Sequence, residues 1–241
     1  MDMYDNQFNP PNDISSRQTG RSGTIHINSK AVMDSIRKTA ENQFAEARGS
    51  HGWDHTLRVY RLCQHIGRVE NADMDVLLIA AYLHDVGRCY QDASNGAICH
   101  AEKGAQIAEP IVNDLPFSDD QKWNIVHSIK SHRFRNDLKP QTLEARVLFD
   151  ADKLDAIGAV GIARAYLFAG EIGARLHNAD LAVEQTEMYS KNDTGFREYQ
   201  VKLCKIKDRI LTREGHRMAV DRHAYMEKFF KRFLEEYGGE R

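Results

Sequence analysis

The 241-residue chain is poor in cysteine and has no long apolar run. Its four cysteines form no Cys-x-x-Cys pair, and we interpret them as reduced thiols in a cytoplasmic protein. No apolar run reaches the roughly 18 residues needed to cross a bilayer. No basic segment followed by an apolar one marks a secretory signal at the N-terminus. We therefore expect no membrane partner.

Neither sign of charge is in excess, because the formal net charge is only -2. This balance gives no electrostatic indication of a nucleic-acid polymer as partner. Hydrophobic residues make up 41% and charged residues 28%, as is typical of a soluble globular protein with one good core or two. Several of the 11 histidines cluster between positions 51 and 132, and they are the one compositional hint of metal chemistry.

The hydrophobic pattern is helical almost throughout. Residues 1–28 are polar and predict a flexible arm, and residues 29–237 predict a single all-α helical bundle domain. The expected helices cover about 29–47, a segment that carries Val59 and Ile66, 75–84, 100–112, a segment capped by Ser118, 156–169, 196–212 and 216–237. We expect a loop over 88–97 and a lid or excursion over 170–193, and we expect Trp123 to face inward.

One dipeptide organises the chain, His84-Asp85, which follows the uncharged run from Val76 to Leu83. Asp73 and Asp75 at the start of this run and Gly87 just past its end favour a helix. A buried charge needs a partner or a metal. His55 upstream and Asp150 downstream are two further places that could supply matching ligands.

Imidazole nitrogen and carboxylate oxygen suit borderline divalent metals such as Mn, Fe, Co, Ni and Zn. Two histidines and two aspartates leave positions open in an octahedral site for water and a substrate oxygen. A metal lowers the pKa of its bound water and polarises a phosphoryl oxygen, which is hydrolytic chemistry. A helical bundle can bring such ligands together from separate helices.

Three segments carry a family resemblance. They are 51–59 (HGWDHTLRV), 83–88 (LHDVGR) and 149–156 (FDADKLDA). In this order they resemble the HD-domain metal-dependent phosphohydrolases, and in particular a branch of small stand-alone predicted hydrolases. The resemblance spans about residues 30–235. It implies a metal at His55, His84, Asp85 and Asp150, with Mn, Co, Ni, Fe, Mg or Zn as the ion.

The resemblance also implies hydrolysis of phosphate esters or anhydrides, with a nucleotide as the best-fitting substrate. A pyrophosphohydrolase reaction on nucleoside triphosphates rests on the resemblance alone. Some members hold a second metal, for which His100 and His132 are candidates, with phosphate binding, a helix cap or a surface position as alternatives. The Gly-Tyr-Pro signature of the cyclic-dinucleotide phosphodiesterases is absent, since Arg133-Phe134-Arg135 follows His132.

Several side chains are expected to bind substrate or to stabilise charge. We assign Asp85, Lys153 and Arg88 to catalysis, because arginine binds phosphate through its bidentate fork and Lys153 lies one turn beyond Asp150. The expected substrate-binding residues are His51, Arg58, His100 and His132. Lys153 pairs with Asp85 or Asp150, or neutralises a phosphate. Asp152 and Asp155 are interpreted only as salt-bridge partners, and the sequence does not assign the general base.

Two other functions remain open at this point. One is a non-catalytic HD module that binds a metal or nucleotide and senses rather than cleaves. The other is a di-iron oxygenase, since some relatives add a histidine pair to the same ligands. The sequence leaves the oligomeric state open, a homodimer included.

Overall fold

The computed structural model describes residues 29–44, 52–94, 96–133 and 138–241, and every regular element in these ranges is a helix. The all-α prediction is therefore confirmed. The arm expected over residues 1–28 lies outside the described residues. In the described part of the chain, no helix combines the length and the apolar character that a membrane span requires.

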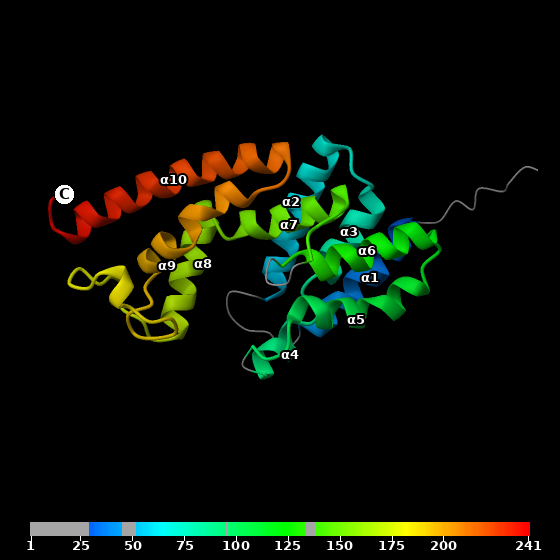
Figure 1. Cartoon of the computed structure of the whole chain (residues 1–241), viewed down its shortest axis with the longest axis horizontal. Coiled ribbons are helices and arrows are strands. Elements are labelled where there is room, and N and C mark those ends of the chain that lie inside the picture. The colour runs from blue at the N-terminus through cyan, green and yellow to red at the C-terminus, as the bar shows by residue number, and fades with distance from the viewer. Residues whose placement is uncertain (1–28, 45–51, 95, 134–137) are drawn as a thin grey trace, which may run out of the picture.

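The described part of the chain begins with seven helices, α1 to α7 (Figure 1), and the dipeptide His84-Asp85 lies in the turn between the third and the fourth. Their bounds are α1 Ser29–Gln43, α2 Trp53–Glu70, α3 Met74–Leu83, α4 Arg88–Ala93, α5 His100–Asn113, α6 Asp119–Ser131 and α7 Leu143–Asp155. The C-terminal elements are α8 Gly158–Glu171, η2 Val183–Gln185, α9 Gly195–Val201, η3 Leu203–Arg209 and α10 Arg213–Tyr237. The long α10 packs on α8 and also contacts α2 and α7.

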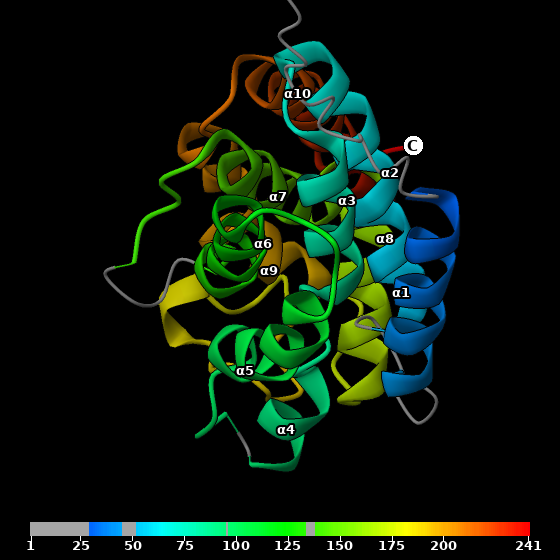
Figure 2. The same ribbon diagram turned by 90° about the vertical axis from the view of Figure 1, so that its right-hand side faces the viewer.

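Helix α3 lies at the centre and contacts α1, α2, α6 and α7 (Figure 2). Seven of its ten residues are buried, as expected for a helix that is apolar on all sides. Asp73 caps its N-terminus by accepting hydrogen bonds from the backbone N–H groups of Asp75 and Val76. The core of the molecule therefore surrounds the helix that leads into His84.

Side-chain caps also fix the start of other helices, α6, α7 and α10 among them. Ser118 and Gln121 form a capping box at α6, which confirms the cap expected at Ser118. Thr142 accepts a hydrogen bond from the N–H of Ala145 at the start of α7. Thr212 accepts one from the N–H of Gly215 at the start of α10.

Three local predictions were wrong. The loop expected over 88–97 contains the short helix α4, whose six residues are too few and too polar to form an apolar stripe. The single helix expected over 196–212 is interrupted at Lys202, whose non-helical backbone separates α9 from η3. Trp123 is 54% exposed and stacks on His127 instead of entering the core. The remaining part of the first predicted helix, residues 45–47, lies outside the described residues.

Candidate metal centre

The end of α3 places His84 and Asp85 in the interior, with exposed fractions of 0% and 1%. The ring of His84 is fixed by a hydrogen bond from Nδ1 to the carbonyl of Ala81, with a length of 2.8 Å. Since a carbonyl only accepts, Nδ1 carries the proton and Nε2 of the neutral ring is left as an acceptor.

Helix α2 brings His55 to the same place. Its Nδ1 donates to Oδ2 of Asp155 at 2.7 Å, and its Nε2 lies 3.4 Å from Nε2 of His84. The same Nε2 lies 3.3 Å from Oδ1 of Asp152 and 3.7 Å from Oδ2 of Asp85. His55, His84 and Asp152 thus form one group whose ligand atoms all lie within 4.8 Å of one another.

A second group consists of Asp85, His100 and His132. The Nε2 atoms of the two histidines are 3.1 Å apart and lie 3.3 and 3.7 Å from Oδ1 of Asp85. Nδ1 of His100 donates to Oε1 of Gln91 at 2.8 Å, and Nδ1 of His132 donates to the carbonyl of Ile129 at 2.6 Å. Asp85 therefore turns one oxygen toward each group of histidines.

Two glycines make the second group possible. A Cβ on Gly87, just after the dipeptide, would lie 2.3 Å from the carbonyl oxygen of His100 and 2.5 Å from the nitrogen of Gly104. A Cβ on Gly104 would lie 3.2 Å from the carbonyl oxygen of His84. The close approach of the turn after α3 to α5 thus depends on the missing side chains, and it brings His100 to Asp85.

The charges of the centre suit a cation. Burial lowers the pKa of His84 to about 4 and that of His100 to about 2, so both rings are neutral near pH 7 and can act as ligands. Burial opposes ionisation of Asp85, yet Arg88 and the surrounding histidines hold the pKa of this carboxyl well below its usual range. Burial likewise opposes ionisation of Asp152, but Lys153 and His55 bring the pKa of its carboxyl well below normal.

The donor set fits a divalent metal. Each of the four histidines has its Nδ1 bonded to an oxygen acceptor, so the Nε2 atoms converge around two ionised carboxylates. Outer oxygen acceptors that fix the tautomer are a regular feature of metal-binding histidines. In neutral rings these Nε2 atoms are all acceptors at short mutual distances, and a shared cation would satisfy them.

The structure does not bring Asp150 into either group, which corrects its expected position. Its carboxylate accepts hydrogen bonds from the N–H groups of Leu211 and Thr212 at 2.8 and 2.7 Å, and from Oγ1 of Thr212 at 2.6 Å. Asp150 therefore holds the segment that begins α10. Asp152, interpreted only as a salt-bridge partner, faces His55, because side chains two positions apart point about 200° apart around a helix.

The expected catalytic cations lie close to the carboxylates. The NH2 group of Arg88 lies 3.3 Å from Oδ2 of Asp85, and Nζ of Lys153 lies 2.7 Å from Oδ2 of Asp152. Lys153 thus pairs with Asp152 and not with Asp85 or Asp150. The expected substrate-binding His51 lies outside the described residues.

Sequence reasoning overlooked Gln91 and Arg164, and it interpreted Asp152 and Asp155 only as salt-bridge partners. Gln91 accepts from His100, and Arg164 donates to Asp155 at 2.7 Å. Arg58, expected to bind substrate, also donates to Asp155, at 2.7 Å from Nε. A DxxD spacing between Asp152 and Asp155, which places both on one face of a helix, was the signal available in the sequence.

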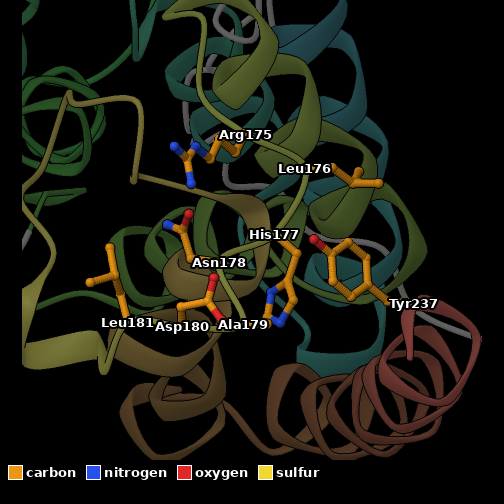
Figure 3. Close-up of a pocket in the computed structure, with 8 residues that line it drawn as sticks. All are labelled: Arg175, Leu176, His177, Asn178, Ala179, Asp180, Leu181 and Tyr237. Atoms are coloured by element: carbon orange, nitrogen blue, oxygen red, sulfur yellow. The ribbon is translucent and has the colours of Figure 1, made fainter.

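A cavity of about 360 Å³ lies elsewhere in the molecule (Figure 3). It is lined by residues 175–181 and Tyr237, and none of these residues belongs to either His/Asp group. His177 there stands edge-on to the ring of Tyr237, with the ring centroids 4.9 Å apart. The convergent polar side chains, not this cavity, therefore mark the candidate centre.

The fold and the two groups place the chain among all-α proteins with a buried site suited to divalent metals. Residues 52–157 match the HD domain family. This match, together with a solved neighbour described as a predicted HD superfamily hydrolase, confirms the resemblance to the HD-domain phosphohydrolase superfamily seen in the three motifs.

Relatives and solved structures agree with this assignment. The uncharacterized protein YpgQ of Bacillus subtilis is 28% identical over 214 residues, which cover 86% of this chain and 94% of YpgQ. A crystal structure of YpgQ in complex with ADP is similar with a TM-score of 0.65 and 26% identity, covering 86% of this chain and 95% of that one.

Two further structures extend the likeness. A Lactobacillus plantarum protein has a TM-score of 0.67 and 28% identity, covering 87% of this chain and 98% of its own. A predicted HD superfamily hydrolase from an uncultured Thermotogales bacterium has a TM-score of 0.59 and 26% identity. The alignment covers 86% of this chain and 92% of that one. The HD fold and the neighbour described as a predicted hydrolase support a metal-dependent phosphohydrolase in general.

Proposed function

We propose that this protein hydrolyses nucleotides with a divalent metal ion, and that it releases pyrophosphate from nucleoside triphosphates. The observation that carries the proposal is the convergence of His55 and His84 with Asp85 and Asp152 in the interior. The complex of YpgQ with ADP supports a nucleotide as the substrate class. We assign this activity to one unit spanning residues 29–237.

The proposed ligands are His55, His84, Asp85 and Asp152, with Asp152 in place of the expected Asp150. A divalent ion held by these residues would lower the pKa of a water molecule and polarise a phosphoryl oxygen. His100 and His132 share Asp85 with this set, and we propose that they hold a second ion or an oxygen of the phosphate.

The chain's own cations fit the remaining tasks. Arg88 is 15% exposed and contacts Asp85, so its guanidinium can donate to a phosphate without losing contact with the centre. Lys153 is 22% exposed and pairs with Asp152, which holds its ammonium next to the ligands. Both groups would stabilise negative charge as it develops on the transferring phosphoryl group.

The second His/Asp group favours one rival function, a di-iron oxygenase. Asp85 faces two histidines on each side, and such a pair of adjoining sites suits two ions. The other alternative is a module that binds a nucleotide without cleaving it, and it would use the same residues. The experiment must therefore measure cleavage, oxygen consumption and binding separately.

The test is a hydrolysis screen on protein stripped of metal and reloaded with Mn, Co, Ni, Mg, Zn or Fe(II). Mono-, di- and triphosphates, ribo and deoxy, are assayed for phosphate and pyrophosphate, with a single-stranded RNA as a polymer control. We expect pyrophosphate from triphosphates and none with Asp85→Ala. Phosphate from monophosphates alone would make the protein a nucleotidase and overturn the pyrophosphohydrolase assignment.

Two further outcomes decide between the rivals. Oxygen consumption by the Fe(II)-loaded protein, without hydrolysis under any metal, would favour the oxygenase. Tight nucleotide binding with neither hydrolysis nor oxygen consumption would favour the sensing module. An exposed control variant, Asp208→Asn, lies on η3 and should behave as wild type in every assay.

A further inference from the structure

The two His/Asp groups of the candidate centre differ in the acceptors behind their histidines. We call the group that contains His55 the first and the group that contains His100 the second. His55 donates from Nδ1 to the carboxylate of Asp155 at 2.7 Å, whereas His100 donates from Nδ1 to the amide oxygen of Gln91 at 2.8 Å. A carboxylate thus lies behind a histidine of the first group, and a neutral amide lies behind a histidine of the second.

The amide oxygen of Gln91 holds His100 in more than one way. Besides accepting from Nδ1, Oε1 lies 3.5 Å from the backbone nitrogen of His100, which is the first residue of α5. The same oxygen accepts from NH1 of Arg133. Gln91 lies on the short helix α4, so its side chain connects that helix to the start of α5 and to the ring of His100.

Arginine contacts are common to both acceptors and do not distinguish them. Arg164 donates to Asp155 just as Arg133 donates to Gln91. The atom that receives the imidazole N–H remains a carboxylate oxygen in the first group and an amide oxygen in the second. Since an acceptor behind a metal-binding imidazole raises its basicity, and a carboxylate oxygen is the stronger acceptor, His55 is the better ligand of the two.

The carboxylates among the candidate ligands differ in the same sense. Asp152 belongs to the first group, and Oδ2 of Asp85 also lies 3.7 Å from Nε2 of His55. The second group has Asp85 as its carboxylate, with Oδ1 3.3 Å from Nε2 of His100. A cation in the first group would face two carboxylates, and a cation in the second would face one that it shares. Two cations on the two oxygens of Asp85 would also repel each other.

We propose that Gln91 is a positioning residue that sets the affinity of the second group for a divalent ion, and that this ion binds after the ion of the first group and more weakly. The inference rests on the proposed metal-dependent function and adds the order of binding and the residue that controls it. Gln91 acts through His100, because its oxygen keeps the proton on Nδ1 and leaves Nε2 as the ligand atom beside Asp85 and His132.

The experiment titrates the metal-free full chain with Mn and follows two signals. Calorimetry measures the affinity of each step, and electron paramagnetic resonance distinguishes a single Mn from a spin-coupled pair. For wild type we expect the single-ion signal up to one Mn per chain and the coupled signal only above that ratio.

Two variants of Gln91 should move the second step in opposite directions. Gln91→Glu keeps the acceptor and places a carboxylate behind His100, so it should strengthen the second step ~tenfold. Gln91→Met removes the acceptor at similar size, so it should weaken that step ~10- to 100-fold. The first step should stay within about twofold of wild type in both variants, because Gln91 does not contact the first group through His55 or His84.

Gln106→Glu is the matched control, since it adds the same charge at an exposed position of α5 and should leave both steps unchanged. If the two Gln91 variants shift the second step in the same direction or not at all, Gln91 only holds the start of α5 and the proposal is overturned. A shift of both steps together, or saturation of wild type at one Mn per chain, would overturn it as well. If the steps shift as expected but no nucleotide is hydrolysed with any metal, the role of Gln91 stands and the proposed reaction fails.

Discussion

His55 and Asp155 form a buried hydrogen bond of 2.7 Å between Nδ1 and Oδ2, although 99 residues separate them in the sequence. The bond fixes which nitrogen of His55 faces Asp152 and His84, and it raises the pKa of His55 together with the bond to Asp152, although burial opposes that rise. A carboxylate behind a metal-binding imidazole orients the ring and increases its basicity. The first prediction follows from this pair.

Asp155→Asn should weaken Mn binding ~10- to 100-fold, because the amide cannot supply the same charge behind His55. Titration calorimetry on metal-free protein measures the change. Asp208→Asn, at an exposed ion pair on η3, is the control and should bind Mn as wild type does. An unchanged Mn affinity in Asp155→Asn would show that the bond is only structural.

Asp152→Ala and Asp150→Ala should fail in different ways. Asp152→Ala should lose Mn binding and keep a folded structure, because its carboxylate faces His55 and is 22% exposed. Asp150→Ala should destabilise the fold by roughly 2–4 kcal/mol, since three donors at residues 211 and 212, two of them buried, lose their acceptor. Urea unfolding measures the stability of both variants, and calorimetry measures their Mn binding. Loss of Mn binding in a stable Asp150→Ala, with Mn binding kept in Asp152→Ala, would restore Asp150 as the ligand.

Gly87→Ala should weaken the packing of the turn after α3 on α5. The new Cβ meets backbone atoms of His100 and Gly104 at 2.3 and 2.5 Å, so one of the two segments must move. We expect a loss of roughly 1–3 kcal/mol and a lower stoichiometry of Mn at saturation. Gly170→Ala is the matched control, because a Cβ there meets nothing within 4 Å and should not destabilise the helix. Equal stability of the two variants would argue against the close approach.

The metal-free protein should lose stability as the pH falls from 6.5 toward 4. The folded pKa of His84 is about 4, below the ordinary 6.5, because burial disfavours the charged ring. The unfolded chain therefore takes up this proton first, so the stability that neutral His84 contributes is present above pH 6.5 and declines below it, by roughly 3 kcal/mol at most.

His55 acts in the opposite sense, since its pKa is raised and its contribution declines as the pH rises above 6.5. Urea unfolding in a chelator at pH 7 and pH 5 should show a smaller loss for His84→Gln than for wild type. A loss of the same size in both proteins would mean that other groups set the acid limit.

The comparison of prediction with structure is most informative along α7. Four apolar side chains of this helix, Val147, Leu148, Ala151 and Leu154, are buried. Asp150, Asp152 and Asp155 all lie within it. Their spacing groups Asp152 with Asp155 on one face of the helix, but the sequence does not tell whether that face or the one with Asp150 lies toward the centre. The partners that separate them, Thr212 for Asp150 and His55 for Asp152, come from other helices.

The sequence by itself determined the helical class, the buried run before His84 and the His/Asp chemistry of three motifs, because helical periodicity and residue type are local properties. Only the tertiary structure decided the rest. It turned Asp150 toward α10 and Asp152 toward His55, placed Gln91 behind His100, and gathered Arg58 and Arg164 on Asp155. These relationships depend on how α2, α4, α7, α8 and α10 pack against one another, and that packing is set by contacts between residues far apart in the chain.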